Sequence, residues 1–263
     1  MPQSVRLPAV AGMFYPADPN TLKKDVDRYL AEAAHHRVSH PKALIAPHAG
    51  YIYSGPVAGN AYAQLDEVAG RISRVVILAP AHRMAFPGLA YSNADNFRTP
   101  LGDIPVDQTA LQQITGLPQV HHLEDAFDNE HSIEVHLPFL QQALGDFQIV
   151  PLLVSDATPQ QVEAVLEQLW GGDETLIVIS SDLSHYMDYQ TARAMDRQAT
   201  QAIETMSPAD LTYQHACGRT PISGLLLAAR QHQLRPTTLD LRNSGDTAGP
   251  RDQVVGYGAY AFS

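Results

Sequence analysis

Three histidines stand just after short apolar runs of the sequence: His48, His82 and His185. Neutral imidazole is a ligand for Fe, Cu and Zn, and its ordinary pKa lets it take up or release a proton near neutral pH. Asp246 follows a further run, residues 237–241. Two imidazoles and one carboxylate could therefore hold a cation such as Fe(II) and leave positions open for a substrate. The alternative is that each histidine only forms hydrogen bonds within its own loop.

A second polar constellation lies in residues 129–138 (NEHSIEVHLP). Ser132 is predicted to cap a helix that starts at Ile133, which would place His131 at the mouth of a pocket and Glu134 one turn inside. The order His-x-x-Glu-x-His differs from the His-Glu-x-x-His motif of zinc-binding helices. We therefore expect His131 and Glu134 to orient a substrate or the ligands of a metal. The alternative is a segment that only caps the helix.

Further side chains could contact a substrate. Tyr51 and Tyr53 follow His48 closely, and each joins an apolar ring to a polar hydroxyl. The alternative places Tyr51 in the core and Tyr53 on the surface. Asp182 is predicted in the same region, as a carboxylate that holds its loop or orients a histidine rather than as a metal ligand. We expect Cys217 to be buried and unreactive.

The elements that must position these residues follow from the apolar pattern. Near-continuous apolar runs predict strands buried on both faces of a sheet, and stretches of helical periodicity separate them. This alternation predicts an α/β fold, a three-layer sandwich with a mainly parallel central sheet flanked by helices. Ligand sites of such sheets form beyond the carboxyl ends of the strands, where these histidines would converge. The strands are predicted at residues 43–46, 74–79, 147–154 and 175–179, and the helices at 56–66, 159–170, 191–204 and 221–231.

Two stretches depart from this pattern. Residues 97–106 predict a hairpin that turns at Leu101-Gly102-Asp103. Residues 253–262 alternate and contain glycines, which favours a strand near a sheet edge. No repeat, low-complexity tract or long linker divides the chain, so we expect residues 1–263 to form a single domain.

Composition restricts the class of protein. The 263 residues include 17 basic and 28 acidic side chains, a net charge of −11. This acidic field argues against direct nucleic-acid binding, and the apolar runs are too short to span a membrane. The N-terminus lacks the apolar segment of a secretory signal, so a cytoplasmic location is expected. A single cysteine excludes an intramolecular disulfide and a multi-cysteine metal site.

Five segments, in this order along nearly the whole chain, resemble the MEMO family. They are residues 6–16 (RLPAVAGMFYP), 47–55 (PHAGYIYSG), 130–138 (EHSIEVHLP), 180–186 (SSDLSHY) and 217–221 (CGRTP). The resemblance implies a fold similar to that of LigB-type extradiol dioxygenases, which use non-haem iron. Prokaryotic members belong to a system with an AMMECR1-type protein and a radical SAM enzyme, which are therefore implied as partners.

The resemblance also implies roles for residues. In the animal member, two histidines and a cysteine line a metal-binding cleft; His48 and His82 match these histidines, whereas the cysteine has no counterpart. Asp246 is the nearest acid and Thr247 the other candidate for the third position. His185 matches a histidine that serves the dioxygenases as an acid–base group.

The first functional hypothesis is accordingly an oxidoreductase that uses Fe(II), or else Cu, on a small-molecule substrate. One alternative is a non-catalytic protein that binds peptides in the same cleft. A second is Zn-dependent hydrolysis with the same ligands. A third is assistance to a radical SAM partner.

Overall fold

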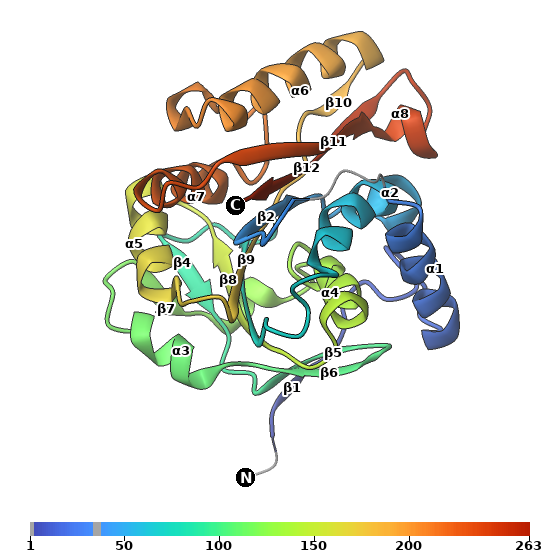
Figure 1. The fold of residues 1–263 in the computed structure, drawn as a ribbon. Coiled ribbons are helices and arrows are strands. Elements are labelled where there is room, and N and C mark those ends of the chain that lie inside the picture. Colours follow the sequence, from blue (N-terminus) through green and yellow to red (C-terminus); the bar gives the residue numbers. More distant parts are fainter. Residues whose placement is uncertain (1–2, 34–37) are drawn as a thin grey trace.

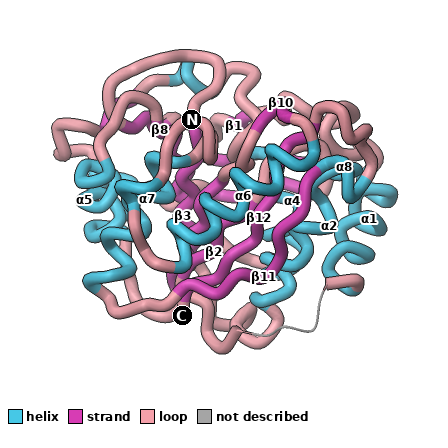
Figure 2. Tube along the Cα trace, turned by 90° about the horizontal axis from the view of Figure 1, so that it is seen from above, coloured by secondary structure: helices cyan, strands magenta, loops and turns pink. Residues whose placement is uncertain are grey.

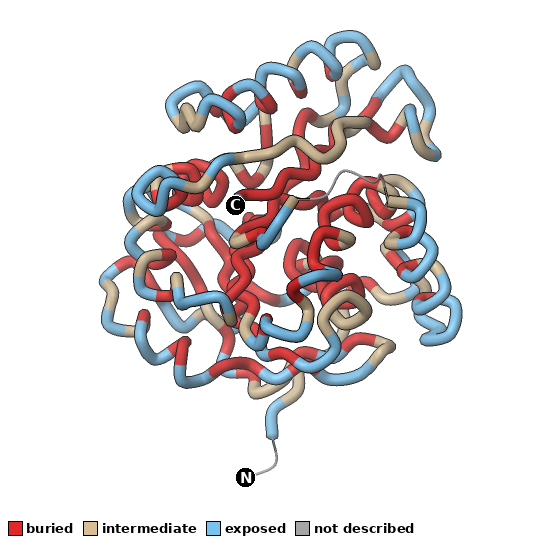
Figure 3. Tube along the Cα trace, viewed as in Figure 1, coloured by how far each residue is buried: buried red, intermediate tan, exposed pale blue. Residues whose placement is uncertain are grey.

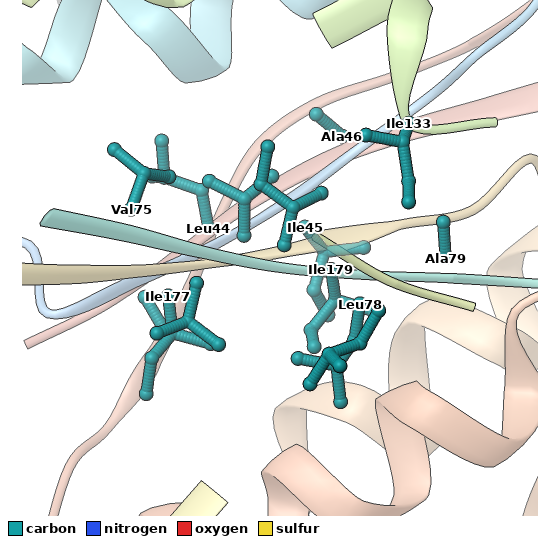
Figure 4. Close-up of a cluster of buried hydrophobic side chains, with 14 of the residues drawn as sticks. Leu44, Ile45, Ala46, Val75, Leu78, Ala79, Ile133, Ile177 and Ile179 are labelled. Atoms are coloured by element: carbon teal, nitrogen blue, oxygen red, sulfur yellow. The ribbon is translucent and has the colours of Figure 1, made fainter. Parts of the chain in front are cut away.

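A large mixed sheet lies at the centre of the computed structural model, which describes residues 3–33 and 38–263 (Figure 1). Strands β2 (Ala43–Ala46), β9 (Thr175–Ser180), β3 (Arg74–Pro80) and β8 (Gln148–Val154) are parallel and adjacent in this order. Their apolar side chains are buried and project from both faces of the sheet (Figure 4). Neither face meets water, which explains the continuous apolar runs. The predicted α/β class is confirmed.

Other strands extend this parallel centre on both sides. Strand β12 (Val254–Phe262) pairs antiparallel with β2, and both β10 (His185–Met187) and β11 (Pro236–Asn243) pair antiparallel with β12. Beyond β8 lie β4 (Leu89–Tyr91), which is antiparallel to β8, and β7 (Val120–His122), which is parallel to β4. The predicted C-terminal strand is therefore β12, one position inside the edge.

A separate three-stranded sheet contains the predicted hairpin. Strands β5 (Asn96–Thr99) and β6 (Gly102–Pro105) are antiparallel, and β1 (Val5–Arg6) pairs in parallel with β5. Gly102 follows the turn at a φ of 130°, a conformation that glycine adopts without strain.

Helices cover both faces of the central sheet (Figures 1 and 2). Helices α1 (Pro19–Ala31), α2 (Tyr51–Tyr62) and α4 (Leu137–Leu144) pack together, whereas α5 (Pro159–Leu169) packs on α7 (Arg219–Gln231). The main chain is buried where these layers meet the sheet (Figure 3). The remaining helices are α3 (Gln108–Ile114), α6 (Tyr189–Glu204), α8 (Ser244–Thr247) and the 3₁₀ turns η1 (Ala63–Leu65), η2 (Glu124–Phe127), η3 (Glu134–His136) and η4 (Pro208–Asp210).

Helix α1 packs closely on α2, whose first residue, Tyr51, stands three positions after His48. A Cβ atom at Gly59 would lie 2.4 Å from the backbone oxygen of Tyr29, so only glycine allows this approach. The Tyr29 hydroxyl also donates a hydrogen bond to the Tyr51 carbonyl, at 3.0 Å.

The carboxyl ends of the central strands reach the same edge of the sheet. Ala46 of β2 stands opposite Ser180 of β9, and Leu78 of β3 stands opposite Ile179. The loops that leave this edge carry the histidines predicted to converge. Among the described residues, no helix has the length and apolar character needed to cross a membrane.

Candidate metal centre

Three imidazoles converge at this edge, from loops far apart in the sequence. His48, His82 and His131 each offer a ring nitrogen, and these atoms lie within 4.8 Å of one another. The ring centroids are 5.1 Å apart for His48 and His82, 5.5 Å for His48 and His131, and 5.0 Å for His82 and His131. The three histidines could hold a metal ion.

Hydrogen bonds determine which nitrogen of His48 is free. Its Nδ1 lies 2.6 Å from the hydroxyl oxygen of Ser180, and this hydroxyl donates its only proton to the carbonyl of Ser132, at 2.7 Å. The hydroxyl must therefore accept a hydrogen bond from His48, which places the imidazole proton on Nδ1. Nε2 of His48 therefore carries the lone pair, which a metal ion could use in place of the neighbouring Cys217 thiol.

Glu130 holds the other two histidines. One carboxylate oxygen accepts hydrogen bonds from Nδ1 of His82 at 3.1 Å and from the backbone N–H groups of His131 and Ser132 at 2.8 and 2.9 Å. The second oxygen accepts the backbone N–H of His82. Burial alone would raise the pKa of Glu130, but the hydrogen bonds from His82 and Ser132 lower it to about 2. Because a carboxylate only accepts, His82 carries its proton on Nδ1 and presents Nε2.

Burial keeps two of these imidazoles neutral, as metal ligands must be. It lowers the pKa of His48 far below its ordinary value, with a further decrease from the neighbouring His82. It also lowers the pKa of His131 to about 4. His48 is fully enclosed, whereas the side chains of His82 and His131 are 29% and 15% exposed. The group is therefore open on the side of His82 and His131, where a substrate could approach.

Asp246, predicted as the third ligand, lies elsewhere. Its carboxylate accepts hydrogen bonds from the backbone N–H of Asn243, at 3.1 Å, and from the hydroxyl of Tyr189. With Asn243 it forms the capping box at the start of α8. In the part of the chain that the structure describes, the three-residue group contains His131 in its place. Thr247, the other candidate, donates its hydroxyl to the Ser244 carbonyl at 3.2 Å.

The predicted roles of Glu134 and Ser132 are also corrected. The carboxylate of Glu134 accepts hydrogen bonds from the backbone N–H groups of Ala9 and Val10 and from the hydroxyl of Tyr15. It therefore fastens the N-terminal segment, and both of its oxygens accept hydrogen bonds within the protein. Ser132 is not a helix cap, because its hydroxyl donates to the carbonyl of Pro80 at 2.8 Å. A 3₁₀ turn, η3, precedes helix α4 instead.

The three residues predicted to contact a substrate lie in different surroundings. Tyr51 belongs to the core, since it is 2% exposed and its hydroxyl donates to the Val135 carbonyl at 2.7 Å. Tyr53 is half-buried. Asp182 lies next to the candidate centre: its carboxylate accepts the backbone N–H of His48 at 2.8 Å, and burial raises its pKa to about 7.

His185 and Cys217 flank the same group. Burial lowers the pKa of His185, and the nearby His82 lowers it further. Sγ of Cys217 lies 3.5 Å from Nε2 of His48. Burial of the thiol and the neighbouring Asp182 raise the pKa of Cys217 to about 12, so the thiol stays protonated. The residue as a whole is half-buried, not fully buried as predicted.

These features define a class of protein, an α/β fold with a histidine-lined candidate metal centre at the carboxyl edge of its sheet. Residues 6–261 match the model of the family described as "Memo-like protein". Curated relatives described as MEMO1 family proteins include one from Sulfolobus acidocaldarius, 33% identical over 98% of this chain and 99% of the relative. Another, from Aquifex aeolicus, is 34% identical over 96% and 97%. The chain belongs to the MEMO family. A solved structure, uncharacterized protein JW3007 from Escherichia coli K12, is similar with a TM-score of 0.48 and 16% identity, over 82% of this chain and 98% of that one.

Glu130 is a site residue that the sequence analysis did not single out, and its role can be tested by Glu130→Gln. We expect the dissociation constant for Zn(II) to rise about 10- to 100-fold, because an amide cannot accept all four hydrogen bonds that His82, His131 and Ser132 donate to Glu130. Isothermal titration calorimetry measures this change. Glu124→Gln is the matched control, since Glu124 bonds to Ser92, Asn93 and His122 and to none of the three histidines of the group. An unchanged dissociation constant in Glu130→Gln would contradict the role.

Proposed function

We propose that this protein is a metal-dependent oxidoreductase, which holds Fe(II), or else Cu, with His48, His82 and His131 and acts on a small molecule. The convergence of the three imidazoles supports the proposal more than any other observation. Imidazole nitrogen suits Fe, Cu and Zn alike, so the donor set fits either redox metal. The Nε2 atoms of His48 and His82 carry the lone pairs that such an ion requires.

The protein's own groups have separate tasks in this proposal. Glu130 and Ser180 fix the proton positions of His82 and His48, so the binding geometry exists before an ion arrives. When bound, an Fe or Cu ion supplies one-electron redox chemistry and polarises a substrate oxygen. His185, whose pKa the nearby His82 lowers, would hold or release a proton at the substrate, since imidazole is suited to general acid–base catalysis.

The test is anaerobic reconstitution with Fe(II), followed by calorimetry and by an ultraviolet–visible titration with nitric oxide. We expect one Fe(II) per chain and new absorption bands on adding nitric oxide. His48→Ala should lose both, while Asp246→Ala, a carboxylate outside the group, should retain both. No uptake, or uptake unchanged in His48→Ala, would refute the proposed centre.

One observation favours a second candidate, Zn-dependent hydrolysis. Three histidines with a position left open are a typical ligand set of catalytic zinc, and the carboxylate predicted to favour Fe(II) is not part of the group. Zinc lowers the pKa of a bound water and so supplies a nucleophile. Metal analysis of protein purified without added metal distinguishes the candidates: zinc alone supports hydrolysis, whereas iron or copper supports oxidation.

A further inference from the structure

We infer that a cavity beside β1 binds a free amino acid with a cationic side chain. The cavity has a volume of about 580 Å³, which suits a small molecule. Its lining consists of residues 4–9, Asn93, Ala94, Glu124, Asp128 and Asn129. The three histidines of the candidate metal centre lie outside this lining. The inference therefore concerns a second ligand site and does not rest on the proposed function.

Two segments far apart in the sequence form the walls of the cavity. Residues 4–9 include β1, at the edge of the three-stranded sheet, and end at Ala9, whose N–H group bonds to Glu134 (Figure 1). The other wall includes η2, where the Glu124 carboxylate accepts a hydrogen bond from the Ser92 hydroxyl at 2.8 Å. Because contacts within the protein hold both walls, the cavity exists before a ligand binds.

The guanidinium of Arg6 supplies the positive charge of the cavity. Its Cζ atom lies 5.9 Å from the ring centroid of Phe97 and 5.5 Å from that of Phe127. Both rings are buried, and they hold the half-buried arginine side chain in place. Within residues 3–33 and 38–263, the guanidinium forms no hydrogen bond or ion pair. Its planar fork of N–H donors matches a carboxylate, which we therefore expect in the ligand.

Two carboxylates make the net charge of the cavity negative. Glu124 and Asp128 line it together with Arg6, so the lining carries two negative charges and one positive charge. The Glu124 side chain is 47% exposed, and Asp128 is exposed without a side-chain hydrogen bond in the described residues. These acids would repel a simple anion such as phosphate, and a diamine would leave Arg6 unpaired. One carboxylate and two ammonium groups complement the lining, as in an amino acid with a cationic side chain.

Apolar and amide groups complete the lining. Leu7 is 64% exposed and lines the cavity next to Arg6. The methylene chain of a lysine-like ligand would cover Leu7 and remove apolar surface from water. The side-chain amides of Asn93 and Asn129 can accept a hydrogen bond from an ammonium group or donate one to a carboxylate. The lining therefore favours an aliphatic chain between the charged groups of the ligand.

The experiment titrates L-lysine and two analogues into the metal-free protein by isothermal titration calorimetry. L-Lysinamide lacks the carboxylate. Nα-Acetyl-L-lysine, which resembles the carboxyl end of a peptide, lacks one of the two ammonium groups. We expect each analogue to bind the wild type about tenfold more weakly than L-lysine, as for the loss of one hydrogen bond between charged groups.

Two variants assign the charges of the ligand to residues. Arg6→Gln should bind L-lysine about tenfold more weakly and no longer distinguish it from L-lysinamide. Asp128→Asn should also bind L-lysine about tenfold more weakly but still prefer it to L-lysinamide. The controls, expected to bind as the wild type does, are Arg98→Gln and Asp125→Asn. Arg98 pairs with Asp103 on the same sheet as Arg6, and Asp125 is an exposed acid of η2 outside the lining.

A wild type that does not bind L-lysine would overturn the inference, and so would an Arg6→Gln variant that keeps the preference for L-lysine over L-lysinamide. Each variant is compared with itself in this ratio, so a change in stability does not produce the expected result. Unchanged binding in Asp128→Asn, an exposed position, would overturn the inference even if Arg6→Gln failed to fold. Equal binding of L-lysine and Nα-acetyl-L-lysine would overturn the assignment to a free amino acid.

Discussion

Replacing His131 by alanine is expected to weaken Zn(II) or Fe(II) binding by more than about 100-fold. The substitution removes one of three donors, a larger loss than that of an outer-shell partner, which costs about 10- to 100-fold. Alanine at this position leaves Glu130 in place, with hydrogen bonds to the backbone of residue 131 and to His82. The fold around the centre should therefore persist. Isothermal titration calorimetry under anaerobic conditions gives the dissociation constants.

Asp246→Ala is the matched variant in the same measurement. Its carboxylate caps α8 and bonds to Tyr189, so its loss should leave the dissociation constant within about twofold of the wild type. The reverse pattern, in which Asp246→Ala loses the metal and His131→Ala retains it, would restore the ligand set predicted from the sequence. Circular dichroism confirms that both variants are folded.

The central strands, and the sheet edge at which the site lies, could be predicted because a strand buried on both faces has a continuous apolar sequence. The runs at residues 43–46 and 175–179 contain only residues that the sheet encloses, and they end where polar loop residues begin. Parallel strands must share one carboxyl edge, so the convergence of His48 and His82 follows from that pattern. For these two histidines, the residue type and the strand topology led to the same prediction.

The place of His131 in the group of three histidines could not be predicted, because it depends on packing between segments distant in the sequence. His131 reaches the centre from a loop that Glu130 ties to His82, a contact between residues 48 positions apart. The misassignment of Asp246 had a local signal against it. Asn243 and Asp246 stand three residues apart, the spacing at which a cap and an acidic partner satisfy the backbone N–H groups of a helix start.

The role of Ser132 was also predicted wrongly, because a contact with a distant segment replaces the local capping contact. Its type and position favour a helix cap, and the local sequence offers no competing partner. In the folded chain the Ser132 hydroxyl lies 2.8 Å from the Pro80 carbonyl, to which it donates a hydrogen bond. The Ser132 carbonyl in turn accepts a hydrogen bond from the Ser180 hydroxyl. Ser132 therefore links the loop that carries His131 to the end of β3 next to His82, because a tertiary acceptor replaces the local one.

Glu134→Ala is expected to lower the free energy of unfolding by about 3 kcal/mol, which urea denaturation measures. The N–H of Val10 and the hydroxyl of Tyr15 are buried and bond to this carboxylate. Each unsatisfied donor costs about 1–3 kcal/mol. Glu32→Ala is the control, since the Glu32 side chain is 61% exposed and its loss should change stability by no more than about 0.5 kcal/mol. A loss below about 1 kcal/mol in Glu134→Ala would contradict the anchoring role.

The same substitution should also act on the candidate centre, through the N-terminal segment of residues 7–15. The Phe14 ring packs 4.7 Å from that of His131, and the Phe14 carbonyl accepts the backbone N–H of Tyr51 at 2.7 Å. If this segment detaches, the Phe14 ring no longer restricts the rotamers of His131. Metal binding should then weaken, although none of the three histidines has been replaced. Limited proteolysis should then cut Glu134→Ala near its N-terminus while the wild type stays intact. Weaker metal binding with the segment still protected would instead indicate that Glu134 acts on the centre directly.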